Sequence, residues 1–153
     1  MPFLIDSNVL ISSYDQIEKQ HAHSYALVER AMNRDVEAVL AHQNLLEYLA
    51  VVTDRKRVEH PLSLEEALMN VDAYGASLNV ISPKPTTIAL LKRLLQAKPV
   101  TKGKVFDLYL AATALDNGIT RICTWNPADF EGLPQLEVVT PERILGELSK
   151  KGK

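Results

Sequence analysis

The chain has 153 residues, of which 46% are apolar. This length suits one hydrophobic core and leaves little room for a second domain. The formal net charge of -2 argues against a protein that coats nucleic acid through overall basicity. It leaves room for a local basic surface beside carboxylates that a bound metal neutralises.

Cys123 is the single cysteine, so no internal disulfide can form. Its place in a predicted strand favours a small buried hydrophobe over a nucleophile. The sequence does not open with a charged segment followed by an apolar signal core, and no apolar stretch approaches the roughly 20 residues that cross a bilayer. We therefore expect a cytoplasmic protein without a membrane-spanning segment.

The first half of the sequence alternates short apolar runs with longer segments of helical periodicity. The run 3–5 is followed by Asp6, Ser7 and Asn8, which favour turns and helix caps and indicate a buried strand that leads into a helix. The same patterns predict three further elements: a helix over 18–33, a strand over 37–41 and a half-buried helix over 43–53.

The second half continues this alternation. Ser63 and Glu66 have the spacing of a capping box, and apolar periodicity carries the helix that follows to Gly75. The remaining predicted elements are a strand over 79–82, a helix to residue 96 with Pro85 in its first turn, a helix from 105 that stops at Gly118, strands over 121–124 and 136–139, and a last helix capped by Thr140, Pro141 and Glu142. We expect one domain over 1–148 and a frayed lysine-rich tail over 149–153.

Strands that alternate with helices predict a parallel sheet with right-handed crossovers. The fold class is therefore α/β, and we expect a three-layer α/β/α sandwich around a central parallel sheet of four to five strands. In such sheets, ligands bind beyond the carboxyl ends of the strands.

Four carboxylates are expected to meet at this edge. Asp6 directly follows the first predicted strand, and Glu47 lies in the early turns of the helix after the second. Asp107 begins the helix before the fourth strand, and Asp129 lies in the loop after that strand. Because crowded carboxylates repel one another, a divalent cation is the partner that makes such a cluster tolerable. Oxygen ligands favour magnesium or manganese over zinc.

Each acid also has a purely structural interpretation. Asp6 could cap the first helix, and Glu47 could face solvent. Asp107 could favour the positive end of its helix, and Asp129 could belong to an ordinary turn. The common position at one edge favours a metal site over four separate structural roles.

Four segments resemble the successive motifs of PIN-domain nucleases, in order and in spacing. They are LIDSNVL at 4–10, Glu47 within a leucine-rich helix, KVFDLYLAA at 104–112 and TWNPADF at 124–130. The resemblance runs from Asp6 to Val139 and is nearest to the stand-alone bacterial and archaeal toxins of the VapC type.

This resemblance implies an endoribonuclease that uses one or two Mg2+ ions, or Mn2+, to hydrolyse RNA phosphodiesters to 5'-phosphate and 3'-hydroxyl ends. The metal would polarise the phosphoryl oxygen and activate a water molecule. Asp6, Glu47 and Asp107 match the principal acids of the family, and either Asp129 or Asn126 matches the variable fourth. A small antitoxin protein and a homodimer are implied as well.

Further residues near these motifs are candidates for supporting roles. Ser7 and Thr124 could orient ligands and Asn8 could brace the turn, although helix capping explains them as well. Trp125 could stack on a base or pack in the core. The candidates for binding the RNA backbone are Lys102, Lys104, Arg55, Lys56 and Arg57, although such charge runs also occur as solvated faces.

Two other functions fit parts of the pattern. A catalytically silent PIN-like module that binds RNA or protein would keep the fold but would not need all four acids. An aspartyl-phosphate phosphotransfer domain also places an aspartate after its first strand. The second acid that such a domain needs nearby is missing from the segment Asp6-Ser7-Asn8.

Overall fold

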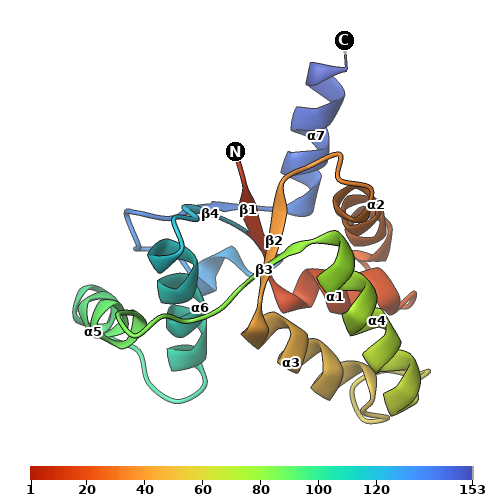
Figure 1. The fold of residues 1–153 in the computed structure, drawn as a ribbon, viewed down its shortest axis with the longest axis horizontal. Coiled ribbons are helices and arrows are strands. Elements are labelled where there is room, and N and C mark those ends of the chain that lie inside the picture. The colour runs from red at the N-terminus through yellow and green to blue at the C-terminus, as the bar shows by residue number, and fades with distance from the viewer. Residues whose placement is uncertain (153) are drawn as a thin grey trace.

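The computed structural model describes residues 1–152 as a parallel sheet between two layers of helices (Figure 1). The strands are β1 (Phe3–Ile5), β2 (Ala38–Ala41), β3 (Asn79–Ile81), β4 (Arg121–Cys123) and β5 (Glu137–Val139). The helices are α1 (Ser7–Tyr14), α2 (His21–Met32), α3 (His42–Val52), α4 (Leu64–Ser77), α5 (Thr87–Ala97), α6 (Lys104–Asp116) and α7 (Pro141–Lys151), with a short 3-10 helix η1 (Pro127–Asp129). The predicted α/β/α sandwich is confirmed.

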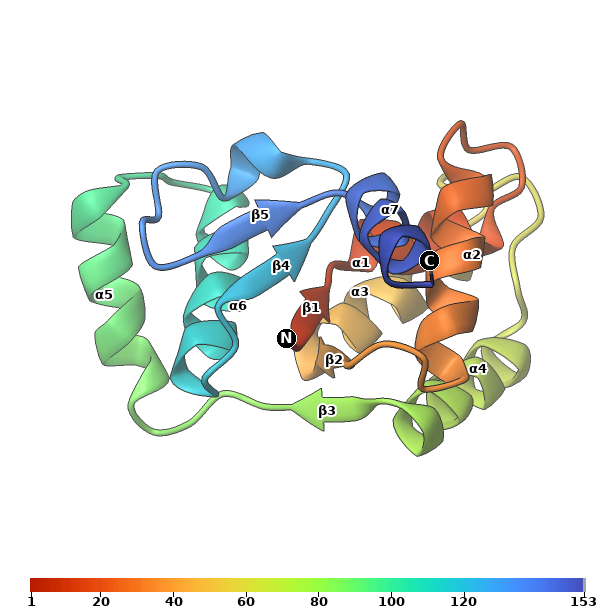
Figure 2. The same cartoon turned by 90° about the horizontal axis from the view of Figure 1, so that it is seen from above.

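The sheet has the strand order β3-β2-β1-β4-β5, and every neighbouring pair is parallel. Figure 2 shows α5 and α6 on one side of it and the other helices on the opposite side. Consecutive residues of β1 alternate between these layers: Phe3 and Ile5 pack on the larger one, and Leu4 packs on the α5–α6 side. The sheet therefore has two apolar faces, as a doubly covered parallel sheet requires.

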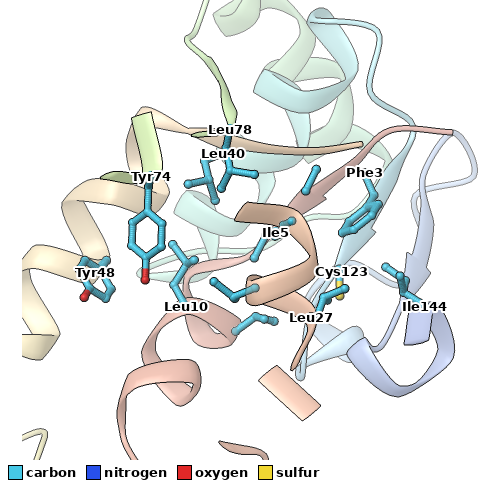
Figure 3. Close-up of a cluster of buried hydrophobic side chains, with 14 of the residues drawn as sticks. Phe3, Ile5, Leu10, Leu27, Leu40, Tyr48, Tyr74, Leu78, Cys123 and Ile144 are labelled. Atoms are coloured by element: carbon cyan, nitrogen blue, oxygen red, sulfur yellow. The ribbon is translucent and has the colours of Figure 1, made fainter. Parts of the chain in front are cut away.

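The larger core surrounds Ile5, Leu10, Leu27 and Leu40, each fully buried (Figure 3). Burying one such side chain stabilises the fold by roughly 1.5–3 kcal/mol. Cys123 is also fully buried in this core, and burial raises the pKa of its thiol, as expected for a small hydrophobe. The apolar core thus fixes the strand ends from which the site is built.

Three predicted boundaries need correction. The helix expected from residue 18 begins at His21, after the separate short helix α1. The helix α4 was expected to end at Gly75 but continues to Ser77, because a single glycine costs only about 1 kcal/mol in a helix. Pro85 was expected in the first turn of α5 but lies in the preceding turn, since the helix begins at Thr87.

The ends of α6 and α7 bear on the remaining predictions. Gly118 follows α6 with a φ of 76°, so the predicted glycine stop is confirmed. Thr140 caps α7 as predicted. The helix α7 continues through Lys151, where Lys150 and Lys151 complement the negative end of the helix dipole. Fraying of the tail from residue 149 stays a prediction, and residue 153 lies outside the described residues. Over residues 1–152, no helix combines the length and apolarity that a membrane span needs.

Candidate active site

A pocket of about 400 Å³ lies at the carboxyl end of the sheet and is lined by all four predicted acids. Asp6 follows β1, Glu47 belongs to α3, Asp107 belongs to α6 and Asp129 ends η1. Because all strands are parallel, the ends of β1 and β2 and the starts of α1 and α3 fall at this one edge. The fold thus brings together carboxylates that are up to 123 positions apart, from residue 6 to residue 129.

Asp6 is the most enclosed of the four acids, with 8% of its surface exposed. It caps α1, because its Oδ1 accepts a hydrogen bond of 2.8 Å from the backbone N–H of Ser7. Its Oδ2 accepts hydrogen bonds from Thr124 Oγ1 at 2.8 Å and from Asn8 Nδ2 at 3.3 Å. The capping role and the site role therefore belong to one side chain.

Glu47 is half-buried, and two side chains hold its carboxylate. Ser7 Oγ donates to Glu47 Oε2, and Gln43 Nε2 donates to Glu47 Oε1 at 2.8 Å. Gln43 and Glu47 are four residues apart on α3 and so share one helix face. Glu47 thus points at the pocket and does not have the solvent-facing role that was its structural alternative.

The other two acids lie on α6 and on η1. Asp107 is in the first turn of α6, and the backbone carbonyl of its neighbour Phe106 accepts a hydrogen bond of 3.0 Å from Gln43 Nε2. Asp129 is the last residue of η1. Lys98 Nζ donates to the backbone carbonyls of Ala128 and Asp129 at 3.1 and 3.0 Å, which fastens that turn to the end of α5.

Burial and the nearby carboxylates raise the pKa values of two of the acids. The pKa of Asp6 is raised from 3.8 to about 6, mainly by burial and also by the charges of Glu47 and Asp107, while the hydrogen bonds from Thr124 and Ser7 oppose the rise. Burial also raises the pKa of Asp107 to about 6, together with the charges of Asp129 and Glu47. Lys104 and Lys98 oppose that rise. The charges of neighbouring acids therefore act on both Asp6 and Asp107, and a cation would relieve this repulsion.

The donor set suits a hard divalent cation. The pocket presents carboxylate and amide oxygens, and neither histidine nor cysteine lines it. Within residues 1–152, no three carboxylate, imidazole or thiol side chains are close enough to hold one ion together. Mg2+ usually binds through one or two carboxylates and keeps several water molecules, so the residues present fit it. The four predicted acids therefore do not close around one ion in this structure, and a metal held by two of them, with water molecules as its other ligands, stays a prediction.

Of the predicted basic residues, Arg57 alone lines the pocket. Arg55 and Lys56 are exposed on the same turn, Lys102 is exposed on the loop before α6, and Lys104 is exposed as the first residue of that helix. Lys104 is near enough to lower the pKa of Asp107. Their contact with RNA stays a prediction.

The predicted supporting residues form one hydrogen-bonded group. Thr124 Oγ1 accepts from Asn8 Nδ2 at 3.0 Å and from the backbone N–H of Asn126 at 3.1 Å, while it donates to Asp6. Asn8 Oδ1 accepts from the backbone N–H of Trp125 at 3.2 Å. Ser7, Asn8 and Asn126 also line the pocket. The group joins the ends of β1 and β4 and sets the path of the loop to Asp129.

Trp125 packs inward. Its indole Nε1 donates a hydrogen bond of 2.8 Å to the fully buried Ser24, and the side chain packs on the larger core. Of the two predicted roles, the structure supports packing over base stacking.

Two residues of the site were not predicted, namely Gln43 and Lys98. Gln43 had a usable signal, because it lies one helical turn before Glu47. No sequence signal pointed to Lys98, because its partners are backbone carbonyls about thirty positions away.

The sequence profile of the PIN domain matches residues 3–135. Two relatives are the VapC ribonuclease Mb2897 of Mycobacterium bovis and the ribonuclease VapC43 of Mycobacterium tuberculosis. Each is 29% identical over 127 residues, which cover 82% of this chain and 84% of the relative.

Solved structures share the fold. A VapBC-1 structure from nontypeable Haemophilus influenzae aligns with a TM-score of 0.65 at 16% identity, over 93% of this chain and 99% of that one. A toxin-antitoxin complex from Klebsiella pneumoniae aligns with a TM-score of 0.63 at 19% identity, over 91% and 97% of the two chains. At these identities, the likeness establishes the fold.

Proposed function

The chain belongs to the PIN domain family, and on this basis we propose that it is a metal-dependent endoribonuclease, the toxin of a toxin-antitoxin pair. The observation that carries the proposal is the pocket lined by Asp6, Glu47, Asp107 and Asp129, in which neighbouring carboxylates help to raise the pKa of Asp6 and of Asp107. The names of the two mycobacterial relatives support ribonuclease activity, and both match this chain over most of its length.

Asp6 and Asp107 would hold a Mg2+ or Mn2+ ion. Glu47 and either Asp129 or Asn126 would bind a second ion or the water molecules around the first. When bound, the metal supplies positive charge to the scissile phosphate and lowers the pKa of a coordinated water molecule. The orientation of the acids and the binding of the substrate depend on this chain's own residues.

Those residues orient the acids and bind the substrate. Thr124 and Asn8 fix Asp6, and Ser7 turns Glu47 toward the pocket. Arg57 stands at the pocket wall, where its guanidinium would bind an RNA phosphate. Lys104 adds positive charge on the other side, beside Asp107.

We also propose a small antitoxin partner, because solved structures with this fold include toxin-antitoxin complexes. A cationic side chain of that partner would occupy the acidic pocket in place of the metal charge. The homodimer and the cytoplasmic location stay predictions.

Cleavage of RNA tests the activity. Purified protein is incubated with total RNA in Mg2+, with and without excess EDTA, beside Asp6→Asn, which keeps the helix cap. We expect cleavage by the wild type in Mg2+, and loss of cleavage in EDTA and in the folded variant. Equal RNA binding by both proteins without cleavage would instead identify a silent binding module.

Coexpression tests the partner. The small protein encoded beside this gene should relieve growth arrest caused by the wild-type chain and should inhibit cleavage in vitro. If cleavage proceeds unchanged in the presence of a stable complex with that protein, the antitoxin proposal is wrong.

A further inference from the structure

The amide of Gln43 lies between two of the acid-bearing helices and is bonded to both. Its Nε2 donates to Glu47 Oε1 at 2.8 Å and to the backbone carbonyl of Phe106 at 3.0 Å. Phe106 directly precedes Asp107 in the first turn of α6. Over residues 1–152, this is the one hydrogen bond that joins α3 to α6.

The orientation of this amide is fixed by its partners. A carboxylate and a carbonyl both accept hydrogen bonds, so the NH2 end must face them and uses both of its hydrogens. Gln43 Oε1 then points into the protein, where it is buried and finds no hydrogen-bond partner within the described residues. A buried acceptor without a donor is unfavourable, so the contacts of Nε2 with Glu47 and Phe106 outweigh that cost.

From these contacts we propose that Gln43 is a positioning residue, which fixes the carboxylate of Glu47 relative to Asp107. This inference rests on the proposed function, in which both acids serve one metal-dependent site. Ser7 holds the other oxygen of Glu47 from α1, so without Gln43 the carboxylate would be tied to one side of the pocket alone. The distance between the acids would then vary, and a cation that prefers octahedral geometry would bind less well.

Mn2+ binding to the whole protein, measured by calorimetry, tests this role separately from catalysis. Gln43→Met keeps the length of the side chain and removes both donors. We expect its Mn2+ dissociation constant to rise about tenfold or more, the usual effect of losing a group that orients a metal ligand. In the RNA assay, kcat should fall while KM for RNA stays within about twofold. Gln96→Met, an exposed glutamine on α5, is the matched control and should behave as wild type.

A double-mutant cycle separates positioning from a general structural effect. In a Glu47→Ala background there is no carboxylate to position, so Gln43→Met should change Mn2+ affinity no further. If Gln43→Met does not fold, Gln43→Ala removes the same donors and carries the same expectations.

Two outcomes would overturn the inference. If the wild type cleaves RNA but Gln43→Met binds Mn2+ as tightly as the wild type, the role of Gln43 is wrong and the proposed function stands. The same conclusion follows if the losses of Mn2+ affinity caused by Gln43→Met and Glu47→Ala add fully in the double mutant. Wild-type protein that neither binds Mn2+ nor cleaves RNA would contradict the proposed function, and this inference with it.

Discussion

Thr124 Oγ1 donates a hydrogen bond of 2.8 Å to Asp6 Oδ2, across the ends of the neighbouring strands β4 and β1. Both residues are buried. This bond opposes the effect of burial on Asp6, since it stabilises the ionised carboxylate and lowers its pKa. It therefore links the geometry of the sheet edge to the charge state of the most enclosed acid.

Thr124→Val should weaken the site while keeping the shape of the side chain. Without the hydroxyl, Asp6 loses its shortest side-chain hydrogen bond, and we expect Mn2+ affinity to fall about 10- to 100-fold, as for other groups that orient a metal ligand. Thr124→Ser retains the donor and should stay near wild type in the same calorimetric titration. Equal affinities in all three proteins would contradict this role.

The raised pKa of Asp6 makes the metal-free protein sensitive to pH. The folded carboxyl, with a pKa of about 6, holds its proton more tightly than the unfolded one at 3.8. The contribution of the Asp6 carboxyl to the free energy of unfolding is therefore fully present below pH 3.8, and it is lost as the pH rises through about 6. Asp6→Asn should stabilise the metal-free protein near neutral pH by an amount on the order of 2 kcal/mol.

Denaturant unfolding in EDTA across this pH range measures that difference. The gain of the variant over the wild type should shrink toward zero in acid, and Mg2+ should stabilise the wild type more than the variant. A gain that does not depend on pH would show that charge burial is not its cause.

Leu40→Ala tests the core beneath the site. Leu40 is fully buried in β2, and its truncation should destabilise the protein by about 2–5 kcal/mol through lost burial and a residual cavity. Leu64→Ala is the matched control, because 64% of that side chain is exposed at the start of α4, and it should cost under about 0.5 kcal/mol. Chemical denaturation followed by circular dichroism compares the two.

Substitution of Arg121 tests a buried ion pair at the amino end of the sheet, opposite the pocket. Its side chain is 10% exposed and pairs with Glu137 and Glu147, which raise its pKa and fasten α7 to β4 and β5. Arg121→Met should lower the free energy of unfolding by about 2–3 kcal/mol, since it leaves two acids without their buried partner. Arg143→Met, at a pairing position that is 56% exposed, should cost less than about 1 kcal/mol. If both variants lose the same free energy of unfolding, burial is not what makes the ion pairs of Arg121 more stabilising than those of Arg143.

The sequence predicted most of the fold, because strand and helix signals were local. The apolar run 3–5, the glycine stop at Gly118 and the cap at Thr140 each determine their element with nearby residues. The boundary errors at Gly75 and Pro85 arose where tertiary packing and the turn before α5 outweighed local preference.

The shared location of the four acids was predictable because each lies in a helix or loop close to one edge of the sheet. What could not be predicted was the set of contacts that hold them. Lys98 bonds to carbonyls of η1, and Gln43 bonds to the carbonyl of Phe106, partners that no sequence period reveals. Among the basic residues, only the path of the chain after α3 decides that Arg57, and not Arg55, reaches the pocket.

Metal titration of wild-type protein and of Asp6→Asn, followed by calorimetry with Mn2+ near neutral pH, tests the central claim most directly. If the carboxylates of this pocket form a metal site, the wild type should bind one or two ions and the folded variant should lose at least one of them. Binding that is absent from the wild type, or identical in the two proteins, would contradict the account.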